Sequence, residues 1–227
     1  MKAFKQFFVE QSEEKTLMIL VGPPAIGKST WIEQNAPDAF VINRDDIVIE
    51  VAKRSGMTYD DLFAAPDKEL PIGHVDDKYG EVIAKPEGFP PFLPDTLWDK
   101  VVQANNDVAE VFKQRFPEAV KSGQDIIIDM TNMSVGARKG IIGNFEGAVK
   151  DYKKVAVVFN FEGSDLQKAI KKVAGIRAKE IKAQGGSKTI PDSAFDRMFA
   201  SYEPISPTEG FDEVINIDDS QRLLQSL

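Results

Sequence analysis

The stretch Gly22-Pro-Pro-Ala-Ile-Gly-Lys-Ser29 decides the fold of this chain. It fits the pattern G-x-x-x-x-G-K-[ST] of a phosphate-binding P-loop. An apolar run, Thr16–Val21, precedes it, and a helical pattern from Ser29 to about Asn35 follows it. In this order the backbone N–H groups of the loop and the positive end of the helix can surround a polyphosphate. The sequence therefore predicts a loop that binds a nucleoside triphosphate.

Each part of the loop has an expected role toward ATP and Mg²⁺. Lys28 can reach the β- and γ-phosphates, and the hydroxyl of Ser29 can hold the metal ion. Ala25 stands where kinases often have glycine, and its methyl group penalises a positive φ angle, but we expect binding to persist. The residues expected to contact the nucleotide here are Pro24, Ala25, Ile26, Gly27, Lys28, Ser29 and Thr30.

The composition excludes several classes of protein. The 227 residues include no cysteine, so a disulfide framework, a thiolate metal site and a redox role are excluded. No apolar run approaches the ~18 residues of a membrane span. The net charge of −8 repels phosphate backbones, so any nucleic acid must bind through a local basic groove. These properties indicate a cytoplasmic enzyme of undetermined oligomeric state.

Five short apolar runs are predicted to be strands because they are rich in β-branched residues and end at turn residues. They are residues 16–21, 39–42, 125–128, 155–161 and 213–217. Helical patterns alternate with them, which predicts an α/β fold of three layers around a mostly five-stranded parallel sheet. Ligands bind at the carboxyl ends of such strands, where the sequence places Asp45 and Asp129.

The same patterns suggest how the chain is organised. Residues 16–221 are predicted to form a single P-loop domain that contains a proline-rich insertion and a helical lid. An amphipathic leader would precede the domain, a long helix from Asp95 to Phe116 would follow the insertion, and a short tail would end the chain. The predicted leader, insertion, lid and tail are residues 1–15, 56–94, 164–188 and 222–227.

Three side chains outside the loop have the chemistry that phosphoryl transfer needs. Asp45 can act as the base for an acceptor hydroxyl, although a first-turn helix acid is the plainer interpretation. Asp129 ends a strand at the position of a Walker-B acid, where it would hold the metal ion's water shell or the acceptor. Arg177 lies in a run of lysines that is either a solvated helix face or a lid over the triphosphate.

Three collinear motifs resemble the kinase domain of bacteriophage 5′-polynucleotide kinases. They are residues 22–31, residues 41–46, and residues 129–132 with Arg138. The resemblance implies a P-loop kinase fold with Asp45 as the base for the 5′-hydroxyl and Arg177 as the lid arginine. It also implies that Lys28 and Ser29 hold the phosphates and the metal. The acceptor would be bound by Arg44, Asp129, Asn132 and Arg138.

The acceptor remains open among several candidates. The phage kinases have an arginine three residues after the base, where this chain has Val48. A polynucleotide 5′-hydroxyl is the first candidate, and a small molecule, a nucleoside or a hydroxymethylated base is the second. A non-catalytic nucleotide-binding module is a third, and a GTPase switch ranks lowest. Residues 1–10 resemble the capsid-targeting leader of T-even phage internal proteins, which would place the chain in a host cytoplasm or a virion.

Overall fold

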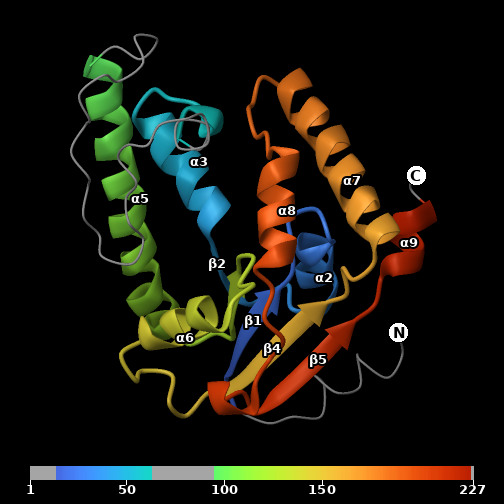
Figure 1. The fold of residues 1–227 in the computed structure, drawn as a ribbon. Coiled ribbons are helices and arrows are strands. Elements are labelled where there is room, and N and C mark those ends of the chain that lie inside the picture. The colour runs from blue at the N-terminus through green and yellow to red at the C-terminus, as the bar shows by residue number, and fades with distance from the viewer. Residues whose placement is uncertain (1–13, 63–94, 226–227) are drawn as a thin grey trace. The chain divides into compact units, whose positions relative to one another are not determined.

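The computed structural model describes residues 14–62 and 95–225, which group into two compact units (Figure 1). Most of the predicted leader and of the proline-rich insertion therefore lies outside the described residues. Where the sequence predicts one domain, unit 1 and unit 2 are each assembled from separate stretches of chain. Unit 1 comprises Met1–Asn43, Gln114–Arg177 and Ile190–Leu227, and unit 2 comprises Arg44–Lys113 and Ala178–Thr189.

Unit 1 contains one sheet of five parallel strands, in the order β2-β3-β1-β4-β5. The strands are β1 (Thr16–Val21), β2 (Phe40–Asn43), β3 (Ile126–Asp129), β4 (Lys153–Phe159) and β5 (Glu213–Ile217). The predicted α/β fold with a parallel sheet is thus confirmed. The first and last strands have the predicted bounds, and the other three are displaced by one or two residues.

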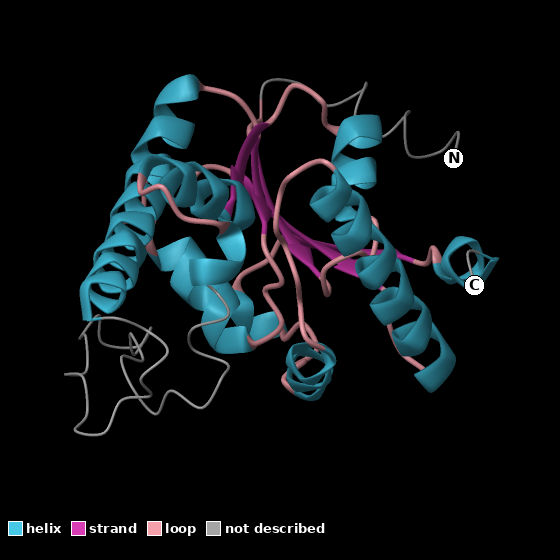
Figure 2. Cartoon of the chain, turned by 90° about the horizontal axis from the view of Figure 1, so that it is seen from above, coloured by secondary structure: helices cyan, strands magenta, loops and turns pink. Residues whose placement is uncertain are grey.

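The central strand of this sheet is wholly buried. All five residues of the run Leu17–Val21 are 0% exposed, so both faces of β1 are covered. Figure 2 shows helices on both sides of the strands. An uninterrupted apolar strand requires this arrangement, because alternate side chains point to opposite faces of a sheet.

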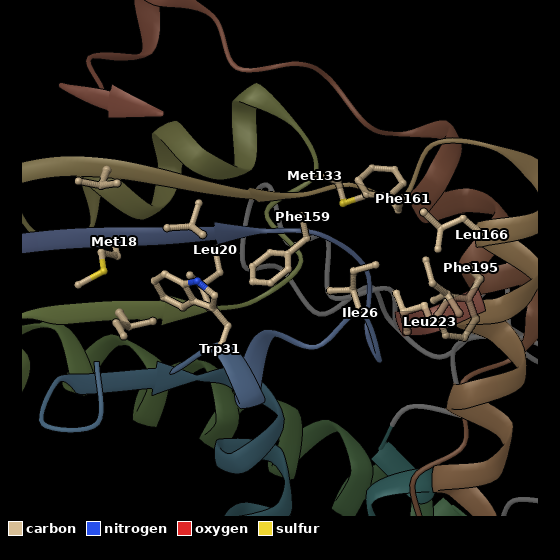
Figure 3. Close-up of a cluster of buried hydrophobic side chains, with 14 residues drawn as sticks. Met18, Leu20, Ile26, Trp31, Met133, Phe159, Phe161, Leu166, Phe195 and Leu223 are labelled. Carbon is tan, nitrogen blue, oxygen red and sulfur yellow. The ribbon is translucent and has the colours of Figure 1, made fainter. Parts of the chain in front are cut away.

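One face of the sheet packs on the helix that follows the P-loop, α2 (Lys28–Asn35). Trp31 of α2 lies edge-on to Phe159 of β4, with ring centroids 6.3 Å apart. Met18 and Leu20 of β1 belong to the same apolar cluster, which Figure 3 shows in close-up. The packing of Trp31 fixes α2, and with it the end of the P-loop, against the strands.

Further helices complete the described chain. They are α3 (Arg44–Arg54), α5 (Asp95–Ser122), α6 (Val135–Gly143), α7 (Ser164–Ala183), α8 (Asp192–Ala200), the 3₁₀ turn η1 (Pro207–Glu209) and α9 (Ser220–Gln225). Because Leu223 of α9 is 5% exposed and belongs to the core cluster of unit 1, residues 222–225 are part of the fold rather than the predicted tail. Within the described ranges, no helix combines the length and apolarity needed to cross a membrane.

Unit 2 has an apolar core of its own. Val48 and Val51 of α3 pack in one cluster with Tyr59, Leu62 and Val108. Val48 is 2% exposed. The side chain that replaces the arginine of the phage kinases is therefore a core residue of unit 2.

Candidate phosphate-binding and acceptor sites

The P-loop begins directly after β1 and depends on two glycines. Gly22 has a φ of 156°, and a Cβ there would lie 3.1 Å from the Cβ of Phe159. Gly27 has a φ of 110° and is the N-cap of α2, which has no side-chain cap. A helix start without a side-chain cap leaves first-turn N–H groups to an anion.

Ala25 lies in the left-handed region, with a φ of 63°. An L-residue with a Cβ pays about 1–3 kcal/mol in such a conformation. The sequence predicts a loop conformation that tolerates a Cβ at this position. Instead, the backbone keeps the left-handed conformation that glycine favours. Ala25 thus stores strain at the centre of the loop.

Lys28 forms hydrogen bonds to the backbone of the loop itself. Its Nζ donates to the backbone oxygens of Gly22 at 2.8 Å and Pro23 at 3.1 Å. Ile26 is 1% exposed and packs in the core, so only its backbone can face a phosphate. Ser29 is exposed and Thr30 half-buried at the start of α2. All seven predicted nucleotide ligands of the loop thus lie in one continuous segment of unit 1.

An arginine that sequence reasoning missed lies beside the loop. A Cβ placed on Gly27 would meet Nη2 of Arg222 at 2.6 Å. Arg222 also pairs with Asp219, from Nε to Oδ2 at 2.6 Å. Both residues follow the last strand, Asp219 at the end of the predicted domain and Arg222 at the start of the predicted tail, and no motif distinguishes them. The P-loop therefore has a second cation near it in addition to Lys28.

Asp129 ends β3, and its partner is Asn43 at the end of β2. The two residues face each other in the register of the sheet, and Asn43 Nδ2 donates to Asp129 Oδ2 at 2.9 Å. Asp129 is 8% exposed. The bond fixes the carboxylate at the end of β3, the position that the sequence predicts for a Walker-B acid.

The donor set fits magnesium better than a metal bound by protein alone. Among residues 14–62 and 95–225, no group of three or more His, Asp or Glu side chains could hold a metal ion. Mg²⁺ usually takes one or two protein oxygens and completes its shell with water and substrate phosphates. The hydroxyl of Ser29 and the carboxylate of Asp129 are oxygen donors of this type.

The loop after β3 is tied to the P-loop strand by Asn132. This residue has a φ of 47° and is 2% exposed. Its Nδ2 donates to the Leu20 oxygen at 2.8 Å, while its Oδ1 has no hydrogen-bond partner among the described residues. The neighbouring Thr131 oxygen accepts from Gly22 N at 3.0 Å. The amide predicted to bind substrate thus joins the loop after β3 to strand β1 through its nitrogen, and its oxygen has no partner among the described residues.

Arg138 corrects the expectation drawn from the resemblance. Its side chain is 0% exposed and forms a two-bond pair with Glu209, at 2.7 Å and 2.9 Å. The remaining donors bond to the backbone oxygens of Asn132, Met133, Glu203 and Pro204. No guanidinium N–H is left for an acceptor. Arg138 is a structural residue of unit 1, not a substrate ligand.

Asp45 and Arg44 begin α3 in unit 2, and Asp45 has two partners that the sequence did not indicate. Tyr59 Oη donates to Asp45 Oδ1 at 2.9 Å. Lys188 Nζ donates to Asp45 Oδ2 at 2.6 Å. Lys188 is the last residue of the predicted lid and lies after the end of α7 at Ala183, where only its charge could have drawn attention. The proposed base is therefore held by groups from two stretches of unit 2.

Burial affects two titratable groups beside Asp45. Burial raises the pKa of the Tyr59 hydroxyl, and the adjacent Asp45 carboxylate raises it further. Tyr59 is therefore a permanent donor at neutral pH. Burial also raises the pKa of Asp46; the charge of Asp45 adds to this rise, and the ammonium of Lys188 opposes it.

Arg177, the predicted lid arginine, is exposed on α7. It is the last residue of the middle stretch of unit 1, and α7 continues beyond it into unit 2. The basic run around it lies on a single helix, as the sequence predicts. Both original interpretations, a solvated face and a lid, apply to such a helix.

Three known structures are similar to this chain at low sequence identity. A kinase candidate from Chloroflexus aurantiacus J-10-fl has 13% identity over 95% of each chain, with a TM-score of 0.48. Chaetomium thermophilum Kti12 in complex with ADP-AlF3 has 12% identity, with 92% of this chain and 96% of that chain covered and a TM-score of 0.44. A structure of the Streptococcus pneumoniae PezAT toxin–antitoxin system has 10% identity, covering 99% and 90%, with a TM-score of 0.42. Sequence identities and TM-scores this low do not indicate an activity for this chain.

The family comparison is more decisive. No curated protein matches the chain. The AAA domain family matches residues 17–205, from the strand before the P-loop to the segment after α8. This match covers most of the 227 residues and includes every predicted site residue. The chain therefore belongs to the AAA domain family, with a P-loop on an all-parallel, five-stranded α/β fold.

Proposed function

We propose that this protein is an ATP-dependent kinase that transfers the γ-phosphate to a hydroxyl group, with a polynucleotide 5′-hydroxyl as its first acceptor. The observation that carries the proposal is the P-loop of unit 1, in which Lys28 bonds back to the Gly22 and Pro23 oxygens. A second support is Asp45, a carboxylate fixed by two donors. A pure nucleotide binder has no need of such a base.

The proposed mechanism divides the work between named side chains. Loop N–H groups and Lys28 bind the triphosphate. Ser29 and Asp129 would hold Mg²⁺, which would neutralise charge on the phosphates. Asp45 accepts the proton of the acceptor hydroxyl. At the same time the hydroxyl oxygen bonds to the γ-phosphorus, and the bond between the γ-phosphorus and ADP breaks. Arg177 faces the negative charge of the transferring group. Arg44 and the amide oxygen of Asn132 are the remaining acceptor ligands that we propose.

Val48 favours a second candidate acceptor, a small hydroxyl compound, a nucleoside or a hydroxymethylated base. Its side chain is 2% exposed in the core of unit 2, so no cation is available at that position for an acceptor phosphate. The net charge of −8 also disfavours a long polyanion. Both candidates use the same P-loop and the same base.

Transfer of labelled γ-phosphate from ATP tests the proposal. The acceptor panel contains 5′-hydroxyl DNA and RNA oligonucleotides, nucleosides, hydroxymethylpyrimidine DNA and water. Label on the oligonucleotide 5′ end supports the first acceptor, and label on a small acceptor supports the second. Release of phosphate to water alone, or no turnover, contradicts a kinase and leaves a nucleotide-binding or hydrolytic module.

The variant Asp45→Asn tests the base. We expect a loss of roughly 10²–10⁴ in kcat with little change in ATP affinity, since the amide cannot accept the proton. The matched control is Asp107→Asn, which removes a carboxylate on α5 that accepts only from the exposed Gln103 at 2.9 Å. Near-normal transfer by Asp45→Asn would exclude Asp45 as the base.

A further inference from the structure

The carboxylate of Asp45 is held on both of its oxygens. Tyr59 donates to Oδ1 at 2.9 Å, and Lys188 donates to Oδ2 at 2.6 Å. The ammonium of Lys188 also lies 5.5 Å from the centroid of the Tyr59 ring, within the range of a cation–π contact. Three side chains of unit 2 thus contact one another pairwise.

Both chain neighbours of Lys188, Ser187 and Thr189, are bonded to a single aspartate. Asp60 Oδ1 accepts from Thr189 N at 2.8 Å, and Asp60 Oδ2 accepts from the Thr189 hydroxyl at 3.2 Å. Asp60 N in turn donates to the hydroxyl of Ser187 at 3.2 Å. Asp60 is next to Tyr59 in the chain, so the two partners of Asp45 are tied together.

The pair between Lys188 and Asp45 is only partly covered. The side chains are 27% and 36% exposed, so solvent or a substrate can reach them. A carboxylate oxygen can accept more than one hydrogen bond, so a hydroxyl that reaches Asp45 can bond to it while Tyr59 and Lys188 stay in place.

We propose that Lys188 is a positioning residue for the catalytic carboxylate Asp45, and that Asp60 holds Lys188 in position. The proposal rests on the proposed kinase function and extends it to the segment after α7. Without Lys188, Asp45 would lose the donor on Oδ2 and would be held less firmly in one rotamer. A displacement of about 1 Å at a reacting group can cost roughly 10²-fold in rate.

The absence of cysteine from the chain allows a direct test. In Lys188→Cys the thiol is the only one present, and alkylation with 2-bromoethylamine restores an ammonium at nearly the original distance. We expect Lys188→Cys to lower kcat about 10- to 100-fold with an unchanged KM for ATP, and alkylation to restore most of kcat. Asp60→Ala should reduce kcat in the same direction.

The matched control is Lys153→Cys, treated with the same reagent. Lys153 pairs with Glu213 at 2.7 Å, and the side chains are 19% and 27% exposed. Both residues begin their strands, at the amino-terminal end of the parallel sheet, and the P-loop follows the carboxyl-terminal end of β1. Transfer by this variant should stay at the wild-type level before and after alkylation.

A second readout does not depend on activity. In protein labelled with [ε-¹³C]tyrosine, the Tyr59 resonance is assigned by its loss in Tyr59→Phe. It should shift in Lys188→Cys and return after alkylation. No shift, or full transfer activity without an ammonium at position 188, overturns the proposal.

If wild-type protein transfers phosphate to no acceptor, the kinase function fails and the positioning role fails with it. The tyrosine spectrum then still reports whether the three-residue contact exists.

Discussion

Gly27 combines two constraints at the junction of the P-loop and α2. Its φ of 110° is unfavourable for any residue with a Cβ, and a Cβ would meet Arg222 at 2.6 Å. Arginine is flexible, so the steric conflict alone is relieved at low cost. The backbone conformation is the lasting constraint, and it determines where the first N–H groups of α2 lie.

We therefore expect Gly27→Ala to lower the affinity for ATP at least 10-fold. It should also lower the free energy of unfolding by about 1–3 kcal/mol. Gly163→Ala is the control, because Gly163 has a φ of 100° with nothing within 4 Å of an added Cβ. It should lose similar stability but keep its ATP affinity. Calorimetric titration and denaturant unfolding measure the two quantities. Equal ATP affinity of both variants would contradict a phosphate-binding role for this loop.

At the scale of elements, one buried ion pair joins α6 to η1. Arg138 of α6 bonds to Glu209 of η1, whose Oε1 also accepts from Ser206 N at 2.7 Å. Burial by itself raises the pKa of Glu209, but the bonds from Arg138 and Ser206 outweigh it and hold the pKa below its usual 4.5. The ionised form is therefore favoured by folding.

The pH dependence of stability follows from this direction. A lowered carboxyl pKa gives stability that is complete above about pH 4.5 and is lost as the pH falls through the folded-state pKa. Between about pH 5 and pH 3, the free energy of unfolding should fall more steeply for the wild type than for Glu209→Gln. Urea unfolding across this range measures both slopes. Parallel slopes would mean that Glu209 contributes nothing to acid unfolding.

Helix α5 illustrates what the sequence could and could not predict for an element. The sequence predicts a helix from Asp95 to Phe116, which would end one residue before Pro117. The helix continues through the proline to Ser122. Phe116 is 1% exposed, its ring packs 4.8 Å from that of Phe145, and Ala119 is 0% exposed. Packing on both sides of the proline outweighs the local preference against helix there.

At the scale of the whole molecule, local sequence patterns predicted the strands and the P-loop because each is formed by a short, continuous stretch of residues. The contacts of Asp45 with Lys188 and of Gly27 with Arg222 join residues far apart in sequence. Neither lysine nor arginine has a periodicity or motif that marks it. Arg138 was misassigned because a motif gives a residue's place in the chain and not its burial.

The net charge of −8 bears on the acceptor. If the acceptor is a polynucleotide, a local cationic groove must overcome the general repulsion. The KM for a 5′-hydroxyl oligonucleotide should then rise steeply with salt, because bound counterions are released. The KM for a nucleoside acceptor should hardly change over the same range. Steady-state transfer at about 50 to 200 mM salt separates the two acceptors, and a flat oligonucleotide profile would exclude phosphate tracking.

Unit 2 consists of Arg44–Lys113 and Ala178–Thr189, with a long stretch of unit 1 in between. During synthesis the ribosome adds about 5–20 residues per second, so Lys188 emerges on the order of ten seconds after Asp45. The nascent chain thus passes through a period in which the residues of strands β1 to β4 have been synthesised but Lys188, the ammonium partner of Asp45, has not. The order of translation, and not only the final contacts, decides when Asp45 acquires both Tyr59 and Lys188 as partners.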